Sequence, residues 1–224
     1  MSIKPILFDT EMVRALLEGR KTVTRRVVKP QPVLDGHLWK LGGAAWSDSV
    51  LSVPVMLGHS LYNRAPYQPG DVLWVRETWC EKMGRRGEYL YRAYAGERDD
   101  TRDYVISHNT WRPSIHMPRE AARIFLRVTS VRVERLQAIT EEDAKAEGAE
   151  KMYPYTDPET GKTAFLLHEN GTYRAGFSQI WDSTIPKRPS LFERYLYYWE
   201  YNPWVWVIEF ERISKEEAKH AKPE

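Results

Sequence analysis

A lysine, two threonines and three arginines are packed into the short segment 19–26, near the start of the chain. Within it, the flexible amine of Lys21 and the hydroxyl of Thr24 are three residues apart, with fixed positive charge beside them. A carboxylate, Glu77, comes much later, at the end of the apolar run 72–75. Amine, hydroxyl and carboxylate are the parts of a small hydrolytic site or of an anion-binding site.

These groups allow two kinds of chemistry. Lys21 can act as general base for the hydroxyl of Thr24, which requires a neutral amine; burial lowers a lysine pKa, and a nearby carboxylate such as Glu77 raises it. Alternatively, Lys21 stays charged and holds an oxyanion or a phosphate while Glu77 handles protons. The plain structural alternative is that Lys21 and Arg25 are solvated, that Thr24 is an ordinary strand residue and that Glu77 is a salt-bridge partner.

Both kinds of chemistry require Lys21 and Thr24 to lie close together, and the predicted elements around the segment limit how this can happen. The pattern predicts a strand at 3–8, a helix from 9 or 10 to 18 that stops at Gly19, and a strand at 22–28. Side chains alternate along a strand, so Lys21 and Thr24 would face opposite sides of an ideal one. They share a pocket only if the chain bends between them.

The rest of the chain predicts one α+β domain over residues 1–213. Further strands are expected at 72–75, 89–93, 124–134 and 204–212, with 89–93 as the hairpin partner of 72–75, and helices are expected at 140–147 and 173–182. Irregular insertions are expected near 30–66, 96–120 and 151–172, followed by a charged tail at 214–224 that frays. Short strands without regular crossover helices favour a small, mixed β-barrel with flanking helices over a doubly wound sheet.

Composition narrows the function further. The chain has 224 residues, a net charge of +2 and a pI near 8.5, which is only mildly basic for a nucleic-acid binder. Its one cysteine, Cys80, fits a reducing, cytoplasmic environment, and no signal peptide or membrane span is expected. The histidines have no metal-ligand spacing, and no nucleotide-binding glycine motif is present, so neither a metal nor a cofactor is expected.

Gly19, Lys21, Thr24 and Arg26 resemble the Gly-x-Lys-x-x-Glu-x-Arg signature of the ASCH domain family, a branch of the PUA-like β-barrel superfamily, with threonine where many members have glutamate. The proline-glycine turn and apolar strand at 66–75 look similar as well. The resemblance covers residues 3–29, 66–94 and 122–212. Three further segments look like ASCH proteins of bacteriophages and prophages: 75–79, 111–118 and 202–207.

The threonine variant is similar to small bacterial ASCH enzymes that hydrolyse N4-acetylcytidine to cytidine and acetate. The resemblance implies that Thr24 is the nucleophile or holds the attacking water. Lys21 would be its base or steady the oxyanion, and Glu77 would orient Lys21 and relay protons. Arg26 would brace the loop or touch the substrate. Trp79 would stack on the pyrimidine or belong to the core.

Two alternatives to an amidohydrolase remain open. PUA-like barrels often bind nucleic acid, and the basic cluster at 20–29 offers phosphate contacts for RNA or single-stranded nucleic acid without catalysis. Some ASCH proteins are thought to cut RNA, so a ribonuclease is the other alternative. The predicted partner of the enzyme is a small nucleoside, with no membrane contact and with an oligomeric state that the sequence does not indicate.

Overall fold

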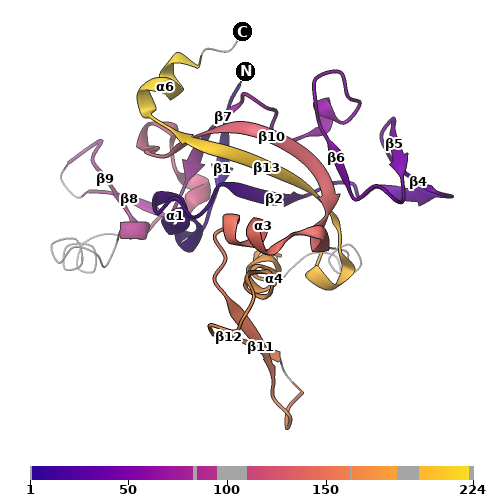
Figure 1. Cartoon of the computed structure of the whole chain (residues 1–224). Helices are drawn as coiled ribbons and strands as arrows, with labels where there is room; N and C mark the ends of the chain where they lie inside the picture. Colours follow the sequence, from indigo (N-terminus) through magenta and orange to yellow (C-terminus); the bar gives the residue numbers. More distant parts are fainter. Residues whose placement is uncertain (1, 83–84, 95–109, 162, 186–196, 222–224) are drawn as a thin grey trace. The chain divides into compact units, whose positions relative to one another are not determined.

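The computed structural model describes residues 2–82, 85–94, 110–161, 163–185 and 197–221 (Figure 1). The described chain is α+β, with more strand than helix and with four α-helices. It divides into two compact units: unit 1 contains Met1–Gly19, Pro69–Thr129 and Phe210–Glu224, and unit 2 contains Arg20–Gln68 and Ser130–Glu209. Its described helices are all too short or too polar to cross a membrane.

Unit 1 is built on a parallel strand pair. β1 (Ile3–Leu7) runs parallel to β7 (Val72–Arg76), and β7 is antiparallel to the first residues of β10 (Phe125–Arg135). The remaining elements are α1 (Thr10–Leu17), β8 (Trp79–Glu81), β9 (Tyr89–Tyr91), the end of β13 (Trp204–Ile213), α6 (Lys215–His220) and the 3₁₀ turns η2 (Arg92–Tyr94), η3 (Ser114–His116) and η4 (Arg119–Ala121). Residues 89–91 pair with β8, whereas the sequence predicted them as partner of 72–75.

Local signals in unit 1 produce the first helix as predicted. The Asp9 side chain accepts a hydrogen bond from the Met12 amide and caps α1, whose apolar face is buried. Gly19 has φ +75°, a left-handed conformation that glycine adopts without a Cβ clash, at the position where the helix was expected to stop.

The end of the chain is more ordered than the sequence suggested. Instead of a fraying tail, residues 215–220 form α6, which begins with a reciprocal capping box between Ser214 and Glu217. Ala218 and Ala221 are buried in the core of unit 1. A small apolar face and a strong cap are enough to dock this charged helix, and residues 222–224 lie outside the described part.

Unit 2 is organised around an antiparallel strand pair. β2 (Val23–Val27) pairs with β13 from Val23↔Glu209 to Val27↔Val205, and Val23, Val205 and Val207 pack with Phe177 and Trp181 in its core. Its other elements are β3 (Val33–Asp35), β4 (Leu38–Leu41), β5 (Ala44–Ser47), β6 (Ser52–Pro54), η1 (Tyr62–Arg64), the end of β10, η5 (Leu136–Ala138), α3 (Glu141–Ala146), β11 (Met152–Thr156), β12 (Thr163–Leu167), α4 (Tyr173–Thr184) and η6 (Trp199–Tyr201).

Two of the predicted insertions contain regular structure. In the 30–66 insertion, β3, β4 and β5 form a three-stranded antiparallel sheet. Trp39 and Trp46 of this sheet meet the buried ring of Trp204 edge-on, at centroid distances of 5.5 and 5.2 Å. The 151–172 insertion folds into the β11–β12 ribbon (Figure 1). Residues 96–109 of the third insertion lie outside the described part of the chain.

The predicted closed barrel is wrong for the described strands. The largest sheet has the order β1-β7-β10-β13-β2, with β6 beside β10, and β1 and β2 stand at its two ends. A barrel requires the two end strands to pair with each other, and the described strands contain no such pairing. Short strands with turns between them are equally typical of open sheets, so their number cannot predict closure.

At Gly176, α4 packs closely against Glu150, which lies shortly before β11 in the chain. A Cβ at this position would overlap the backbone carbonyl of Glu150. We expect Gly176→Ala to lower the free energy of unfolding by about 1–3 kcal/mol, although alanine has the higher helix propensity. Urea unfolding measures the change, with Gln179→Ala on the exposed face of α4 as control. Equal or greater stability of Gly176→Ala would contradict this packing.

Candidate functional site

The Lys21 amine is enclosed by three oxygen acceptors. Nζ donates to a Glu147 carboxylate oxygen at 2.6 Å, to the Glu147 carbonyl at 2.8 Å and to the Val23 carbonyl at 2.9 Å. The backbone prepares this contact, because Lys21 forms a β-bridge with Glu147 and the Thr22 amide donates to the Ala146 carbonyl. The end of α3 therefore lies beside the residues that lead into β2, and only 4% of Lys21 is exposed.

Burial and the charge of Glu147 have opposite effects on the pKa of Lys21. Burial is the largest influence and lowers the pKa of Lys21 below its ordinary value of 10.5, and Arg26 and Arg25 lower it further. The Glu147 carboxylate raises the pKa through its charge and its hydrogen bond, without cancelling the burial. The three acceptors can use all three N–H donors of an ammonium group, whereas burial away from water favours the neutral amine.

Arg25 connects the Glu147 carboxylate to a larger buried network of ion pairs. Its guanidinium contacts Glu134 at 2.6 Å, Asp143 at 2.9 Å and Glu147 at 3.3 Å, and no part of its side chain is exposed. Arg132 joins the network through Glu134, at 3.0 Å, and Asp143, at 3.3 Å. The charges are therefore compensated inside unit 2, by β2, β10 and α3 together.

Thr24 and Arg26 follow the alternation of β2. Arg25 faces the carboxylate network, so the side chains of Thr24 and Arg26 point to the opposite face of the strand. Thr24 is buried and Arg26 is half-buried, with a guanidinium bond to the Arg25 carbonyl at 3.2 Å. The Lys21 amine reaches the Val23 carbonyl, which belongs to the same peptide group as the Thr24 nitrogen. Lys21 and Thr24 therefore meet through the backbone and not through their side chains, because the amine lies with Glu147 and Arg25 on one face of β2 and the Thr24 side chain points to the other.

Glu77 occupies an enclosed position in unit 1. Only 1% of it is exposed, and its two carboxylate oxygens accept bonds from Arg123 at 2.9 and 2.8 Å. The Arg123 guanidinium is itself stacked against Tyr91 and Tyr94, with ring centroids 4.0 and 4.1 Å away. Burial raises the pKa of Tyr91 to about 12, so its hydroxyl stays protonated and donates to the Ala121 carbonyl. The pairing of Glu77 with Lys21 stays a prediction.

Trp79 belongs to the core of unit 1. It is 4% exposed, and its ring meets Tyr89 edge-on at 5.6 Å and the Arg112 guanidinium at 5.3 Å. The indole nitrogen finds no acceptor among the described residues. Of its two expected roles, the structure supports packing.

Sequence reasoning missed the direct partners of the predicted residues. Glu147 lies 126 positions after Lys21, and Arg123 lies 46 positions after Glu77. The one available signal was compositional: 141–147 places four acids in a short helix beside a strand pattern that carries Arg25. Arg123 directly precedes the predicted strand 124–134, a position where an arginine is as easily solvated as buried.

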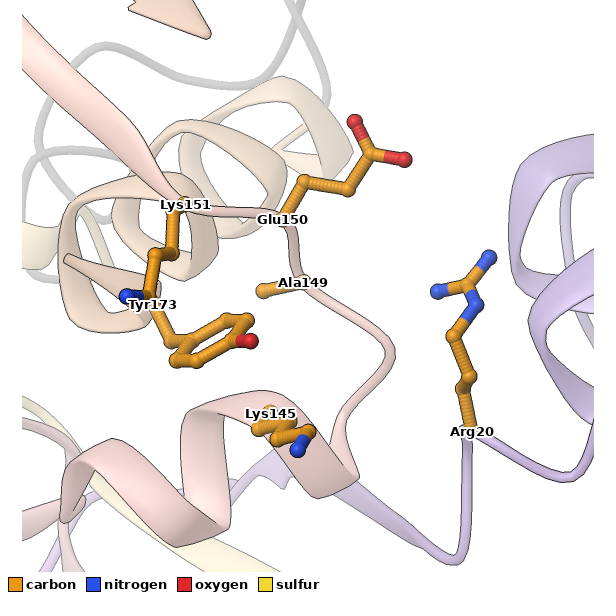
Figure 2. Close-up of a pocket in the computed structure, with 6 residues that line it drawn as sticks. All are labelled: Arg20, Lys145, Ala149, Glu150, Lys151 and Tyr173. Atoms are coloured by element: carbon orange, nitrogen blue, oxygen red, sulfur yellow. The ribbon is translucent and has the colours of Figure 1, made fainter. Parts of the chain in front are cut away.

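A separate cavity of unit 2 lies next in sequence to the Lys21–Glu147 pair. It measures about 280 Å³ and is lined by Arg20, Lys145, Ala149, Glu150, Lys151 and Tyr173 (Figure 2). In the described residues, acids, histidines and the cysteine do not gather in groups of three that could hold a metal ion. The chain matches no protein-family model, no curated protein and no solved structure.

Proposed function

We propose that the protein is an amidohydrolase that removes the acyl group from N4-acylated cytosine nucleosides. The observation that carries the proposal is the buried amine of Lys21, whose pKa is lowered by burial and which lies against the Val23–Thr24 peptide group. A lysine that can lose its proton supplies the base of Ser–Lys-type hydrolysis, and the proposal further requires the Thr24 hydroxyl to turn from the opposite face of β2 toward this amine. The resemblance of 19–26 to the ASCH amidohydrolases supplies the substrate class.

In the proposed reaction, the Thr24 hydroxyl, once turned toward the Lys21 side of β2, attacks the acyl carbon and its proton passes to the neutral Lys21 amine. The amide C–N bond then breaks, the cytosine amino group takes up the proton, and the acyl group remains as an ester on Thr24. Water hydrolyses the ester, which releases the carboxylic acid and restores the threonine. Each step conserves atoms and needs no external oxidant or reductant.

The supporting residues have defined tasks in this proposal. Glu147 orients the Lys21 amine through its short carboxylate bond, a task that the resemblance alone assigned to Glu77. Glu77 keeps the proposed proton relay, which requires it to release one of its bonds to Arg123. Arg26 braces β2 through the Arg25 carbonyl. We further propose an ASCH, PUA-like identity for the chain on the strength of the same motif.

Hydrolysis of N4-acetylcytidine, followed by absorbance, tests the proposal. We expect the wild-type protein to produce cytidine, and Lys21→Met or Thr24→Val to lower kcat by at least about 100-fold, the usual contribution of a positioned base. Thr24→Ser keeps the hydroxyl and should retain most of the rate. Because the Lys21 pKa lies below 10.5, the wild-type rate should rise with pH as the amine becomes neutral and level off below that value.

The controls separate a lost catalytic group from a damaged fold. Glu11→Gln changes an exposed carboxylate in α1 and should leave the rate unchanged. Circular dichroism and thermal unfolding report whether each variant is folded. A wild-type protein without turnover, or folded Lys21 and Thr24 variants with unchanged turnover, would remove the proposal.

A further inference from the structure

The cavity at α3 and α4 concentrates positive charge. Lys145 and Lys151 place their ammonium groups 5.8 and 5.7 Å from the centroid of the Tyr173 ring. Neither lysine forms an ion pair with an acid in the described part of the chain. Arg20 completes the lining, with its guanidinium bonded to the Gly148 carbonyl at 3.1 Å.

Glu150, the single acid of the lining, does not neutralise the two lysines. Its carboxylate extends away from the Tyr173 ring, on the side of Arg20 (Figure 2). Two like charges beside one ring repel each other, and a bound anion relieves that repulsion. The cavity is therefore complementary to a phosphate group.

An exposed aromatic face begins where the cavity ends. β11 follows Lys151 directly, and alternation puts Tyr153 and Tyr155 on the same face of the strand as Lys151. Tyr153 is 51% and Tyr155 46% exposed, and Leu166, opposite Tyr153 on β12, is 52% exposed. The ribbon extends away from α4 (Figure 1), and the exposed fractions of Tyr153 and Tyr155 make both rings accessible to a ligand.

We propose that this surface binds single-stranded nucleic acid, with backbone phosphates in the cavity and bases against Tyr153 and Tyr155. Aromatic side chains next to a cationic groove are the combination that single strands require, because every base has a face to stack and every nucleotide a phosphate. Two residues along an antiparallel strand span about 6.8 Å. This is twice the stacking distance of about 3.4 Å and leaves room for one base between two rings.

The proposed surface is separate from the proposed hydrolytic site. A free nucleoside carries no phosphate, so it has nothing to place in the cavity. Variants of the surface should bind nucleic acid more weakly and still deacylate N4-acetylcytidine at the wild-type rate. Failure of either proposal is thus measured by its own assay.

Fluorescence anisotropy with a labelled ten-nucleotide RNA, over a series of salt concentrations, tests the surface. The double variant Lys145→Gln/Lys151→Gln should bind more weakly, and its logarithmic salt slope should be smaller by about 1.4, since each phosphate contact on a single strand contributes about 0.7. Tyr153→Ala/Tyr155→Ala should raise Kd roughly 5-fold to 100-fold while leaving the salt slope unchanged.

The chain contains a matched control for the lysines. A cavity of about 340 Å³ in unit 1 is lined by Lys215 and Lys219 of α6, and Lys215→Gln/Lys219→Gln removes the same charge at a distant place in the sequence. It should lower affinity much less than the Lys145/Lys151 pair. An RNA affinity that is equal for both double variants would overturn the proposal, since general charge would then explain binding.

Two further outcomes would also overturn it. Cytidine monophosphate or inorganic phosphate that competes as strongly as the RNA would indicate a small-anion site without a strand path. Gel filtration could also show that the wild-type protein is a dimer and that the tyrosine variant is a monomer with unchanged RNA binding. That result would indicate that the ribbon contacts a second copy of the chain. Thermal unfolding of every variant ensures that the comparison is made between folded proteins.

Discussion

Replacing Arg25 by methionine is expected to lower the free energy of unfolding by about 3–5 kcal/mol. The guanidinium is fully buried and contacts three carboxylates, those of Glu134, Asp143 and Glu147. Without it, these acids and Glu209, which pairs with Arg132, share Lys21 and Arg132 as their only cationic partners in the described part of the chain. Buried negative charge without compensation is costly, because the carboxylates of Glu134 and Glu147 are almost fully shielded from water in the folded state. Urea unfolding at neutral pH measures the loss.

Two comparisons identify the cause of that loss. Arg127→Met removes an arginine from the exposed pair with Glu211 and should cost less than about 1 kcal/mol. Adding Glu134→Gln to Arg25→Met removes one excess negative charge and should recover part of the stability. A cost for Arg25→Met as small as that for Arg127→Met would show that the network does not depend on this residue.

Arg123→Met should have an effect of similar size in unit 1, about 3–5 kcal/mol. It leaves the carboxylate of Glu77 enclosed without its cation, since Arg123 provides both bonds to the carboxylate oxygens. It also removes the cation that lies between Tyr91 and Tyr94, whose ring contacts stabilise a desolvated guanidinium. Chemical unfolding, with tyrosine and tryptophan fluorescence as signal, measures the change.

A double-mutant cycle separates the ion pair from the packing of the arginine. Glu77→Gln and Arg123→Met are each expected to be destabilising, and their combination should cost less than the sum of the two. The coupling energy is the contribution of the buried pair, and the remainder belongs to the tyrosine contacts. Strict additivity of the two changes would contradict a direct interaction between the residues.

The predictions that succeeded rest on short-range signals. The cap at Asp9, the stop at Gly19 and the β-branched residues within 22–28 each act within a few residues, and α1 and β2 begin and end close to the predicted positions. The capping box at 214–217 is an equally local signal, which the charge of the tail obscured. Local chemistry of this kind can be read from a single sequence.

The features that escaped prediction depend on residues far apart in the chain. Alternation indicated that Lys21 and Thr24 lie on opposite faces of a strand. It could not indicate that Glu147, at the end of α3, accepts a hydrogen bond from the Lys21 amine. Barrel closure depends on the stagger between neighbouring strands, and the sequence of a single strand does not encode this stagger. The strands of the 30–66 insertion are only three or four residues long, so their pattern is too short to show a period.

The three-stranded sheet of the 30–66 insertion has a consequence for how this chain could be trimmed. Its residues Trp39 and Trp46 cover Trp204, which is one of the most completely buried side chains of the protein. Deletion of residues 33–47 would expose the large indole surface of Trp204 to solvent. An exposed apolar surface of this kind promotes aggregation. A shorter descendant of this chain would therefore need a smaller or more polar residue at position 204 before it could discard the sheet.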